Sequence, residues 1–139
     1  MSRPVLVAGN WKMNGDRVFA GQLARQVVDH VRHLLADAGP TPASESGAAR
    51  PAAGPSPVAV ACLPPAPYLE IVGDILHGTT VALGGQDLSP HDPGAYTGDL
   101  SASMLVDLGA RYVIVGHSER RAFHAETAPQ LRDKIAAAR

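Results

Sequence analysis

Residues 5–15 read VLVAGNWKMNG, so that a short apolar run, Val5–Ala8, leads directly into a polar turn. An uninterrupted apolar run of this length is typical of a β-strand that is covered on both faces. Beyond the turn, apolar residues recur at helical spacing from Phe19 to Leu35, and Asp16 stands where it can cap the start of that helix. We therefore predict a strand, a turn and a helix in this order, and the rest of the chain repeats the pattern.

Three further apolar runs of strand length each precede a segment with helical spacing. The strands are predicted at Val58–Cys62, Thr80–Leu83 and Tyr112–Val115, and the helices near Tyr68–Leu76, Ser101–Leu108 and Ala128–Arg139. Four strand-then-helix units predict an α/β fold of parallel strands with helices packed outside them. Right-handed crossovers bring the carboxyl ends of such strands to one rim, where α/β folds bind ligands. The residues expected on that rim are Asn10, Cys62, Gln86 and His117.

Composition and charge exclude several classes of protein. The chain has 139 residues, of which 45% are apolar, and this is enough for the core of one domain. A net charge of -1 and an aromatic content of 4% disfavour nucleic-acid binding through phosphate neutralisation or base stacking. Cys62 is the only cysteine, so no internal disulfide can form. With no apolar run of membrane length and no secretory signal, we expect a cytoplasmic protein without a membrane partner.

The segment Gly39–Pro57 departs from the strand and helix pattern. It holds five prolines, three glycines, three serines and five alanines, but no valine, isoleucine, leucine or aromatic residue. Such a segment buries too little apolar surface to offset the entropy of ordering it. We interpret it as a disordered insertion rich in Pro, Gly, Ala and Ser, at the end of the first helix; a linker or docking role is the alternative.

The turn after the first strand carries a candidate binding group. Lys12 is one of only two lysines in the chain, and it lies two residues beyond the expected end of that strand. An ammonium group on a ligand-binding rim suits an anionic substrate, because it is a point charge near a phosphate or a developing oxyanion. Asn10 could donate from its amide to the same ligand. The alternatives are a solvated surface lysine and an asparagine that caps a turn.

A second candidate group follows the fourth predicted strand, where the sequence reads GHSERR over residues 116–121. Ser118 and Glu119 suit the first turn of a helix, and a helix start disfavours a positive charge on His117. We therefore expect a neutral imidazole, with one nitrogen accepting from the backbone and the other free to donate to a carbonyl and polarise it. The alternative is a histidine at a strand end whose ring is satisfied by the backbone.

The remaining motifs point to no cofactor. The other five histidines lack metal-ligand spacing, and no glycine-rich nucleotide-binding pattern occurs. Residues 94–99 read GAYTGD, which predicts a protruding, well-formed loop, with a plain turn as the alternative. We therefore expect neither a metal nor a cofactor.

Four blocks, in this order along the chain, give the sequence a close resemblance to the triosephosphate isomerase family. They are GNWKMNG at residues 9–15, QD at 86–87, GAYTGD at 94–99 and VGHSERR at 115–121. The first and last blocks are each very specific, and the resemblance covers the chain outside the insertion. Members of the family are (β/α)8 TIM barrels of about 250 residues, so the resemblance implies the first four β/α units of such a barrel, an N-terminal half over residues 1–139.

The resemblance also implies roles for the rim residues. Asn10 and Lys12 resemble the family's substrate-binding pair, and His117 resembles its neutral electrophile. Glu119, with Ser118 beside it, resembles the acidic group that pairs with the lysine. The implied reaction interconverts dihydroxyacetone phosphate and D-glyceraldehyde 3-phosphate through an enediolate, in glycolysis and gluconeogenesis, without a cofactor.

The family's homodimer implies a further set of residues. Thr97 resembles the loop residue that enters the neighbouring subunit's site, and Asp99 and Arg120 resemble an ion pair between subunits. Met13 and Gly98 complete the implied interface.

One part of the family's machinery has no counterpart in these residues. The family's base is a glutamate at the end of the sixth strand, and neither Glu70 nor Glu126 stands at a predicted strand end. We therefore expect this chain alone to have essentially no isomerase activity. The alternative is a non-catalytic half-barrel that binds a partner chain, or itself, through the open edges of its sheet.

Overall fold

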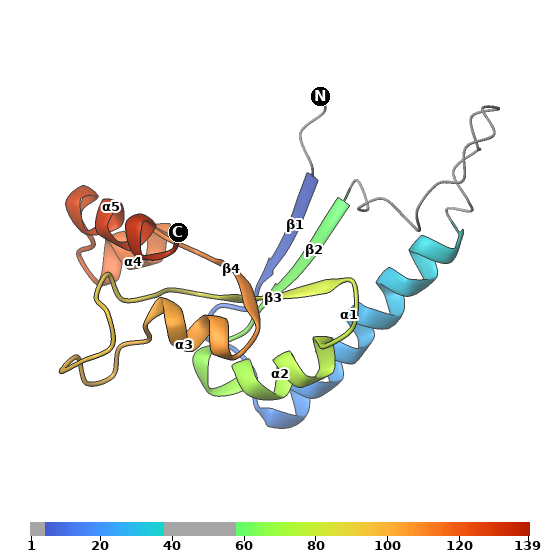
Figure 1. The fold of residues 1–139 in the computed structure, drawn as a ribbon. Helices are drawn as coiled ribbons and strands as arrows, with labels where there is room; N and C mark the ends of the chain where they lie inside the picture. Colours follow the sequence, from blue (N-terminus) through green and yellow to red (C-terminus); the bar gives the residue numbers. More distant parts are fainter. Residues whose placement is uncertain (1–4, 38–57) are drawn as a thin grey trace, which may run out of the picture.

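The structure is a computed structural model that describes residues 5–37 and 58–139. Its centre is a four-stranded parallel sheet in the order β1-β2-β3-β4, with helical segments between successive strands (Figure 1). The strands are β1 (Val5–Asn10), β2 (Val58–Leu63), β3 (Val81–Gly85) and β4 (Ala110–Val113). The helices are α1 (Arg17–Asp37), α2 (Leu69–Leu76), preceded by the 3-10 turn η1 (Ala66–Tyr68), α3 (Ala102–Asp107), α4 (Ser118–Phe123) and α5 (Ala128–Ala137).

The register of the strands brings their carboxyl ends to one rim. β1 pairs with β2 along its whole length, from Val5 opposite Val58 to Asn10 opposite Leu63. Between β3 and β4 the register shifts at Gly84. A Cβ atom on Gly84 would lie 2.9 Å from the side chain of Leu63, so only glycine lets the backbone of β3 lie this close to the Leu63 side chain of β2.

Helices α1 and α2 lie side by side and cover one face of the sheet (Figure 1). The start of α1 is capped as the sequence predicts, because the Phe19 amide donates to Asp16 Oδ1 over 2.8 Å. Ala20 and Ala24 on α1 are fully buried, and small residues at this spacing let the two helices pack closely.

The core lies between α2 and the two central strands. Leu69, Val72 and Leu76 occupy the buried face of α2 and pack with Val81 and Leu83 of β3. Each such side chain contributes about 1.5–3 kcal/mol on full burial. The centre of the sheet is therefore held by ordinary apolar packing.

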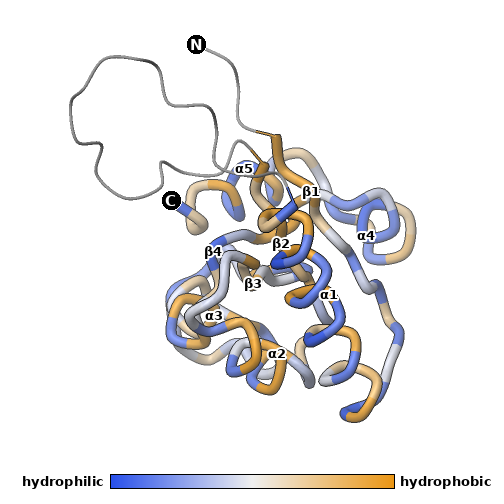
Figure 2. The backbone as a smooth tube through the Cα atoms, turned by 90° about the vertical axis from the view of Figure 1, so that its right-hand side faces the viewer, coloured by the Kyte–Doolittle hydropathy of each residue, from blue (hydrophilic) through white to orange (hydrophobic). Residues whose placement is uncertain are grey.

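The first strand has a different environment from the central ones. β1 and β4 form the two edges of the sheet. Along β1, Val5, Leu6 and Val7 are 55%, 47% and 54% exposed. All three are apolar, and Figure 2 shows this strand in the colour of hydrophobic residues. The described residues thus leave an uncovered apolar strand at one edge of the sheet.

Most of the predicted elements are confirmed, with two differences of position. β4 begins at Ala110 and ends at Val113, two residues earlier at each end than predicted, because β3 ends at Gly85, the partner of Val113; the Ile114 amide still donates to the Gly85 carbonyl over 3.0 Å. Cys62 lies one residue before the end of β2 and is buried in the core, so its expected place on the rim was wrong. The predicted insertion, residues 39–57, lies outside the described residues. Over the described ranges, no helix is long and apolar enough to cross a membrane.

Candidate active site

The turn after β1 holds Lys12 in an unusual backbone conformation. Its φ angle is 54°, in the left-handed region that non-glycine residues rarely adopt, at a cost of order 1–3 kcal/mol. Two hydrogen bonds hold this conformation. The Lys12 amide donates to Asn10 Oδ1 over 2.9 Å, and Gln86 Nε2 donates to the Lys12 carbonyl over 2.9 Å. Both polar backbone groups of Lys12 are therefore fixed by side chains from the ends of two strands.

Gln86 connects three strand ends at the rim. Besides the Lys12 carbonyl, its Nε2 group donates to the carbonyl of Leu63, the last residue of β2, over 2.9 Å. The Trp11 amide donates to that same carbonyl over 3.1 Å. The rim position predicted for Asn10 and Gln86 is thus confirmed, and the sequence analysis did not anticipate the role of Gln86 in holding the Lys12 turn.

The side chain of Lys12 reaches across the rim to Glu119. Lys12 Nζ donates to Glu119 Oε1 over 2.8 Å, although the two residues are 107 positions apart. The two side chains are 52% and 44% exposed, so the ammonium group is open to a solute from the solvent. The hydrogen bond from Lys12 lowers the pKa of Glu119 below its ordinary value, and the Lys12 charge adds to this effect.

His117 lies beside this pair, at the start of α4. Its Nδ1 atom accepts a hydrogen bond from the Glu119 amide over 3.2 Å, as predicted. An accepting nitrogen carries no proton, so in the neutral ring the proton is on Nε2, which remains able to donate. Glu119 Oε2 lies 3.5 Å from the same Nδ1. The contact with the amide is the shorter of the two, and it uses the lone pair of Nδ1.

The geometry brings together an ammonium group, an amide and an imidazole on one rim. Asn10 uses its oxygen for the Lys12 amide, which leaves its Nδ2 group without a hydrogen-bond partner in the described part of the chain. Ser118 is the first residue of α4 and is exposed. Such an arrangement can bind an anion and donate hydrogen bonds to a carbonyl or an oxyanion. Among the described residues, no group of three His, Cys, Asp or Glu side chains could hold a metal ion.

The residues expected at a subunit interface lie in two places. Met13 is 94% exposed on the Lys12 turn, and Thr97, Gly98 and Asp99 lie in an exposed loop. Within this chain Asp99 accepts a hydrogen bond from Ser89 Oγ over 2.7 Å. Their part in an interface stays a prediction, because the structure contains one chain.

Arg120, expected at the same interface, is engaged within the chain. It belongs to a set of four charged residues that we call the charge cluster, which consists of Asp87, Arg120, Glu126 and Lys134. Arg120 Nη2 lies 2.8 Å from Asp87 Oδ2, and its Nε atom donates to Glu126 Oε1 over 2.6 Å. This cluster was not among the features predicted from the sequence. A signal was available, since Lys134 follows Leu131 by three positions and so shares the inward face of α5.

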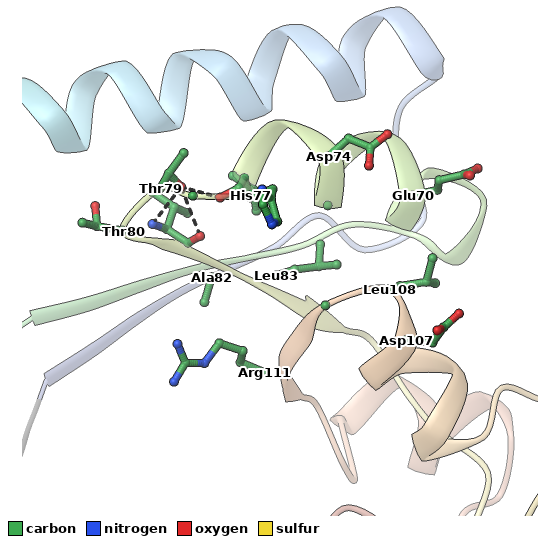
Figure 3. A pocket seen from close by; sticks show the side chains of 15 residues that line it. Glu70, Asp74, His77, Thr79, Thr80, Ala82, Leu83, Asp107, Leu108 and Arg111 are labelled. Carbon is green, nitrogen blue, oxygen red and sulfur yellow. Dashed lines mark hydrogen bonds between the residues drawn. The ribbon is translucent and has the colours of Figure 1, made fainter.

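A cavity of about 780 Å³ lies at the other end of the sheet, away from these groups (Figure 3). Its lining includes His77 at the end of α2, Val81 at the amino end of β3 and Arg111 in β4. The acidic residues that line it, Glu70, Asp74 and Asp107, are all exposed. The cavity is therefore a hollow between the elements and does not contain the rim residues.

The fold and the rim define a class of protein: a parallel β/α fold that brings an ammonium group, an amide and an imidazole together at the carboxyl ends of its strands. The family model described as "Triosephosphate isomerase" matches residues 5–139. The chain therefore belongs to the triosephosphate isomerase family.

Individual relatives agree with this assignment. The chain is 43% identical over 136 residues to a triosephosphate isomerase of Xanthomonas campestris pv. campestris (strain 8004). This match covers 98% of the chain and 45% of the relative. A triosephosphate isomerase of Xylella fastidiosa (strain 9a5c) is 41% identical, with 98% and 46% covered. The crystal structure of triosephosphate isomerase from Bartonella henselae is 34% identical with a TM-score of 0.75, and it covers 98% of this chain and 47% of that one.

These comparisons confirm the fold expected from the sequence. The four parallel strands with their helices are four β/α units of a TIM barrel, and the barrel is incomplete in this chain. The chain spans about half the length of the curated relatives that it matches.

Proposed function

We propose that this chain provides the substrate-binding and electrophilic half of a triosephosphate isomerase active site. The observation that carries the proposal is the meeting of Lys12 and Glu119 over 2.8 Å, with His117 beside them at the same rim. The substrate is a triose phosphate. The reaction is the interconversion of dihydroxyacetone phosphate and D-glyceraldehyde 3-phosphate, a step of glycolysis and gluconeogenesis, in the cytoplasm.

Each residue has a distinct part in the proposed reaction. A carboxylate base removes a proton from the carbon next to the carbonyl, which leaves an enediolate with negative charge on oxygen. His117 donates from Nε2 to that oxygen, and Lys12 stabilises both this charge and the phosphate. Asn10 donates from Nδ2 to the same ligand. Only protons move, so the reaction needs no cofactor.

The base is the part that this chain does not supply in the proposal. Glu70 lies in α2, and Glu126 is engaged by Arg120 and Lys134 below the rim, so neither carboxylate is available to the substrate. General-base assistance typically contributes about 10²–10⁴-fold. We therefore expect the purified 139-residue chain to be essentially inactive as an isomerase.

The proposed assembly is the homodimer that the family resemblance implies. Thr97 and Gly98 lie in an exposed loop that is free to enter a neighbouring subunit, and Met13 is open to the solvent near Lys12. This arrangement supports an interface around the rim, with Asp99 and Arg120 as its charged members.

The test is to complete the barrel. The chain is joined to the half of the Xanthomonas campestris relative that it does not cover, and isomerisation of dihydroxyacetone phosphate is measured for the joined protein and for the chain alone. We expect turnover by the joined protein only. In the joined protein, His117→Gln should lower kcat by about 10²-fold or more, the scale of one oxyanion donor. A folded joined protein without turnover, or with a kcat that His117→Gln leaves unchanged, contradicts the proposal.

The alternative function is a non-catalytic half-barrel that binds a partner chain or itself. The observation in its favour is the edge strand β1, whose apolar side chains Val5, Leu6 and Val7 are about half exposed. Open edges of this kind also predict marginal stability of the chain alone. Size-exclusion chromatography separates the cases: association that Val7→Lys abolishes supports binding through β1, whereas a stable, sharply melting monomer counts against it.

A further inference from the structure

The charge cluster lies below the rim, where Lys134 and Glu126 are nearly buried and Arg120 and Asp87 are partly exposed. Lys134 Nζ donates to Asp87 Oδ1 and Oδ2 over 2.7 and 2.8 Å and to Glu126 Oε1 over 2.6 Å. The side chains of Lys134 and Glu126 are only 9% and 6% exposed. Arg120 contacts the same two carboxylates. Two positive and two negative groups are thus locked together by charge-assisted hydrogen bonds.

Two members of the cluster are the direct chain neighbours of rim residues. Asp87 follows Gln86, which holds the Lys12 carbonyl. Arg120 follows Glu119, which pairs with the Lys12 ammonium group and donates its amide to His117. The cluster is therefore attached to the two segments that contact Lys12, which are the end of β3 and the first turn of α4.

The energetics of the cluster do not make it an efficient source of stability. Burial on its own would raise the pKa of Glu126, but the hydrogen bonds from Lys134 and Arg120 outweigh it and lower the pKa. Glu126 Oε2 is buried without a hydrogen-bond partner among the described residues. Replacing a buried ion pair by apolar side chains is often neutral or stabilising, so the burial of Lys134 and Glu126 indicates a role other than stability.

We propose that the charge cluster positions the candidate active site, with Lys134 as its central positioning residue, by tying the end of β3 and the start of α4 to α5. Without Lys134, the carboxylates of Asp87 and Glu126 repel each other, and the two segments that carry Gln86 and Glu119 separate. The proposal rests on the proposed function, because it concerns the geometry of Lys12, Glu119 and His117.

The experiment compares variants of the full 139-residue chain by NMR. Lys134→Met removes the positive charge and keeps the length of the side chain; Lys134→Arg keeps the charge. Arg132→Met is the matched control, since it removes one positive charge from an exposed position of the same helix. The signals followed are the ring nitrogens of His117 and the Glu119 amide proton that His117 Nδ1 accepts. His77, at the other end of the sheet, is the internal reference.

A positioning role and a merely structural role predict different spectra. Circular dichroism gives the folded fraction of each variant, and spectra are compared for the folded species. We expect Lys134→Met to shift the His117 and Glu119 signals and to lose the Glu119 hydrogen-bonded amide. His77 should not move, Arg132→Met should match the unsubstituted chain, and Lys134→Arg should restore the signals.

A second variant keeps the proposal testable if Lys134→Met does not fold. Glu126→Gln has the same shape and retains one oxygen for Lys134, and we expect a smaller shift of the same His117 and Glu119 signals. Folded variants in which these signals stay where they are in the unsubstituted chain overturn the proposal. The readout needs no substrate, so a failure of the proposed function, seen as no turnover by the completed barrel, is a separate result.

Discussion

The chain has two lysines, and each pairs with a different glutamate, one in the first turn of α4 and the other just after that helix. Lys12 and Glu119 meet over 2.8 Å at the rim, where both side chains are about half exposed. Lys134 and Glu126 meet over 2.6 Å below it, where both are almost completely buried. The same pair of chemical groups therefore occurs in two environments within one small region of the fold.

The difference between the pairs indicates a division of work. Water screens the charges of the exposed pair, so a ligand can replace Glu119 as the partner of Lys12 at little cost. The buried pair cannot exchange its partner for a ligand in the same way, because water does not reach it to replace a lost partner. We infer that the rim pair serves to bind a ligand and that the buried pair serves to hold the segments around the rim in place.

Breaking the buried pair should have the largest effect on stability. Lys134→Met leaves the carboxylates of Asp87 and Glu126 with Arg120 as their only cation in the cluster, and we expect a loss of about 3–5 kcal/mol in the free energy of unfolding. Urea denaturation followed by circular dichroism measures it. Arg132→Met, on the solvent side of α5, should leave the midpoint unchanged. Equal effects of the two substitutions would mean that the buried pair contributes no more to stability than an exposed charge on the same helix.

Acid should weaken the buried pair in a characteristic way. The pKa of Glu126 is lowered in the folded chain, so this carboxylate contributes stability above the ordinary glutamate value, and the contribution is lost as the pH falls through that value toward the folded one. We expect the free energy of unfolding to fall with decreasing pH over this window. Glu126→Gln should make that fall shallower, as measured by urea denaturation at a series of pH values; an unchanged slope would show that Glu126 does not carry the effect.

The exposed pair should contribute least to stability. Lys12→Met removes the partner of Glu119, but water takes its place, and we expect a shift of the denaturation midpoint far smaller than that of Lys134→Met. Added salt should reduce even this difference, since it screens exposed charges. A loss as large as that of Lys134→Met would show that Lys12 has a structural role and would remove the contrast between the pairs.

The sequence predicted the pieces that depend on local pattern. The apolar runs placed the four strands, Asp16 marked the start of α1, and His117 with Ser118 marked the start of α4, because strand, cap and helix signals act over a few residues. The order of strands and helices, with right-handed crossovers, also placed Asn10, Gln86 and His117 at one rim. Cys62 was placed wrongly, since the end of a strand was off by one residue and one residue reverses the face of a side chain.

The charge cluster could not be predicted in the same way. Asp87, Glu126 and Lys134 lie 8 to 47 positions apart, and they meet only because the fold brings Lys134 of α5 to the segment that follows β3. Glu126 on its own is a charged residue in a polar segment, which is ordinarily solvated. The hold of Gln86 on Lys12 similarly depends on the register of three strands.

The central claim, that the rim of Lys12 and His117 binds a triose phosphate, is tested most directly by titrating dihydroxyacetone phosphate into the chain labelled with ¹⁵N at its histidines. Concentrations on the order of 10 mM exceed a dissociation constant of about 1 mM, which corresponds to only about -4 kcal/mol. We predict that the ring nitrogens of His117 shift with saturation, that those of His77 do not, and that Lys12→Met abolishes the response. A His117 signal that stays fixed, or that moves equally in Lys12→Met, would contradict the account.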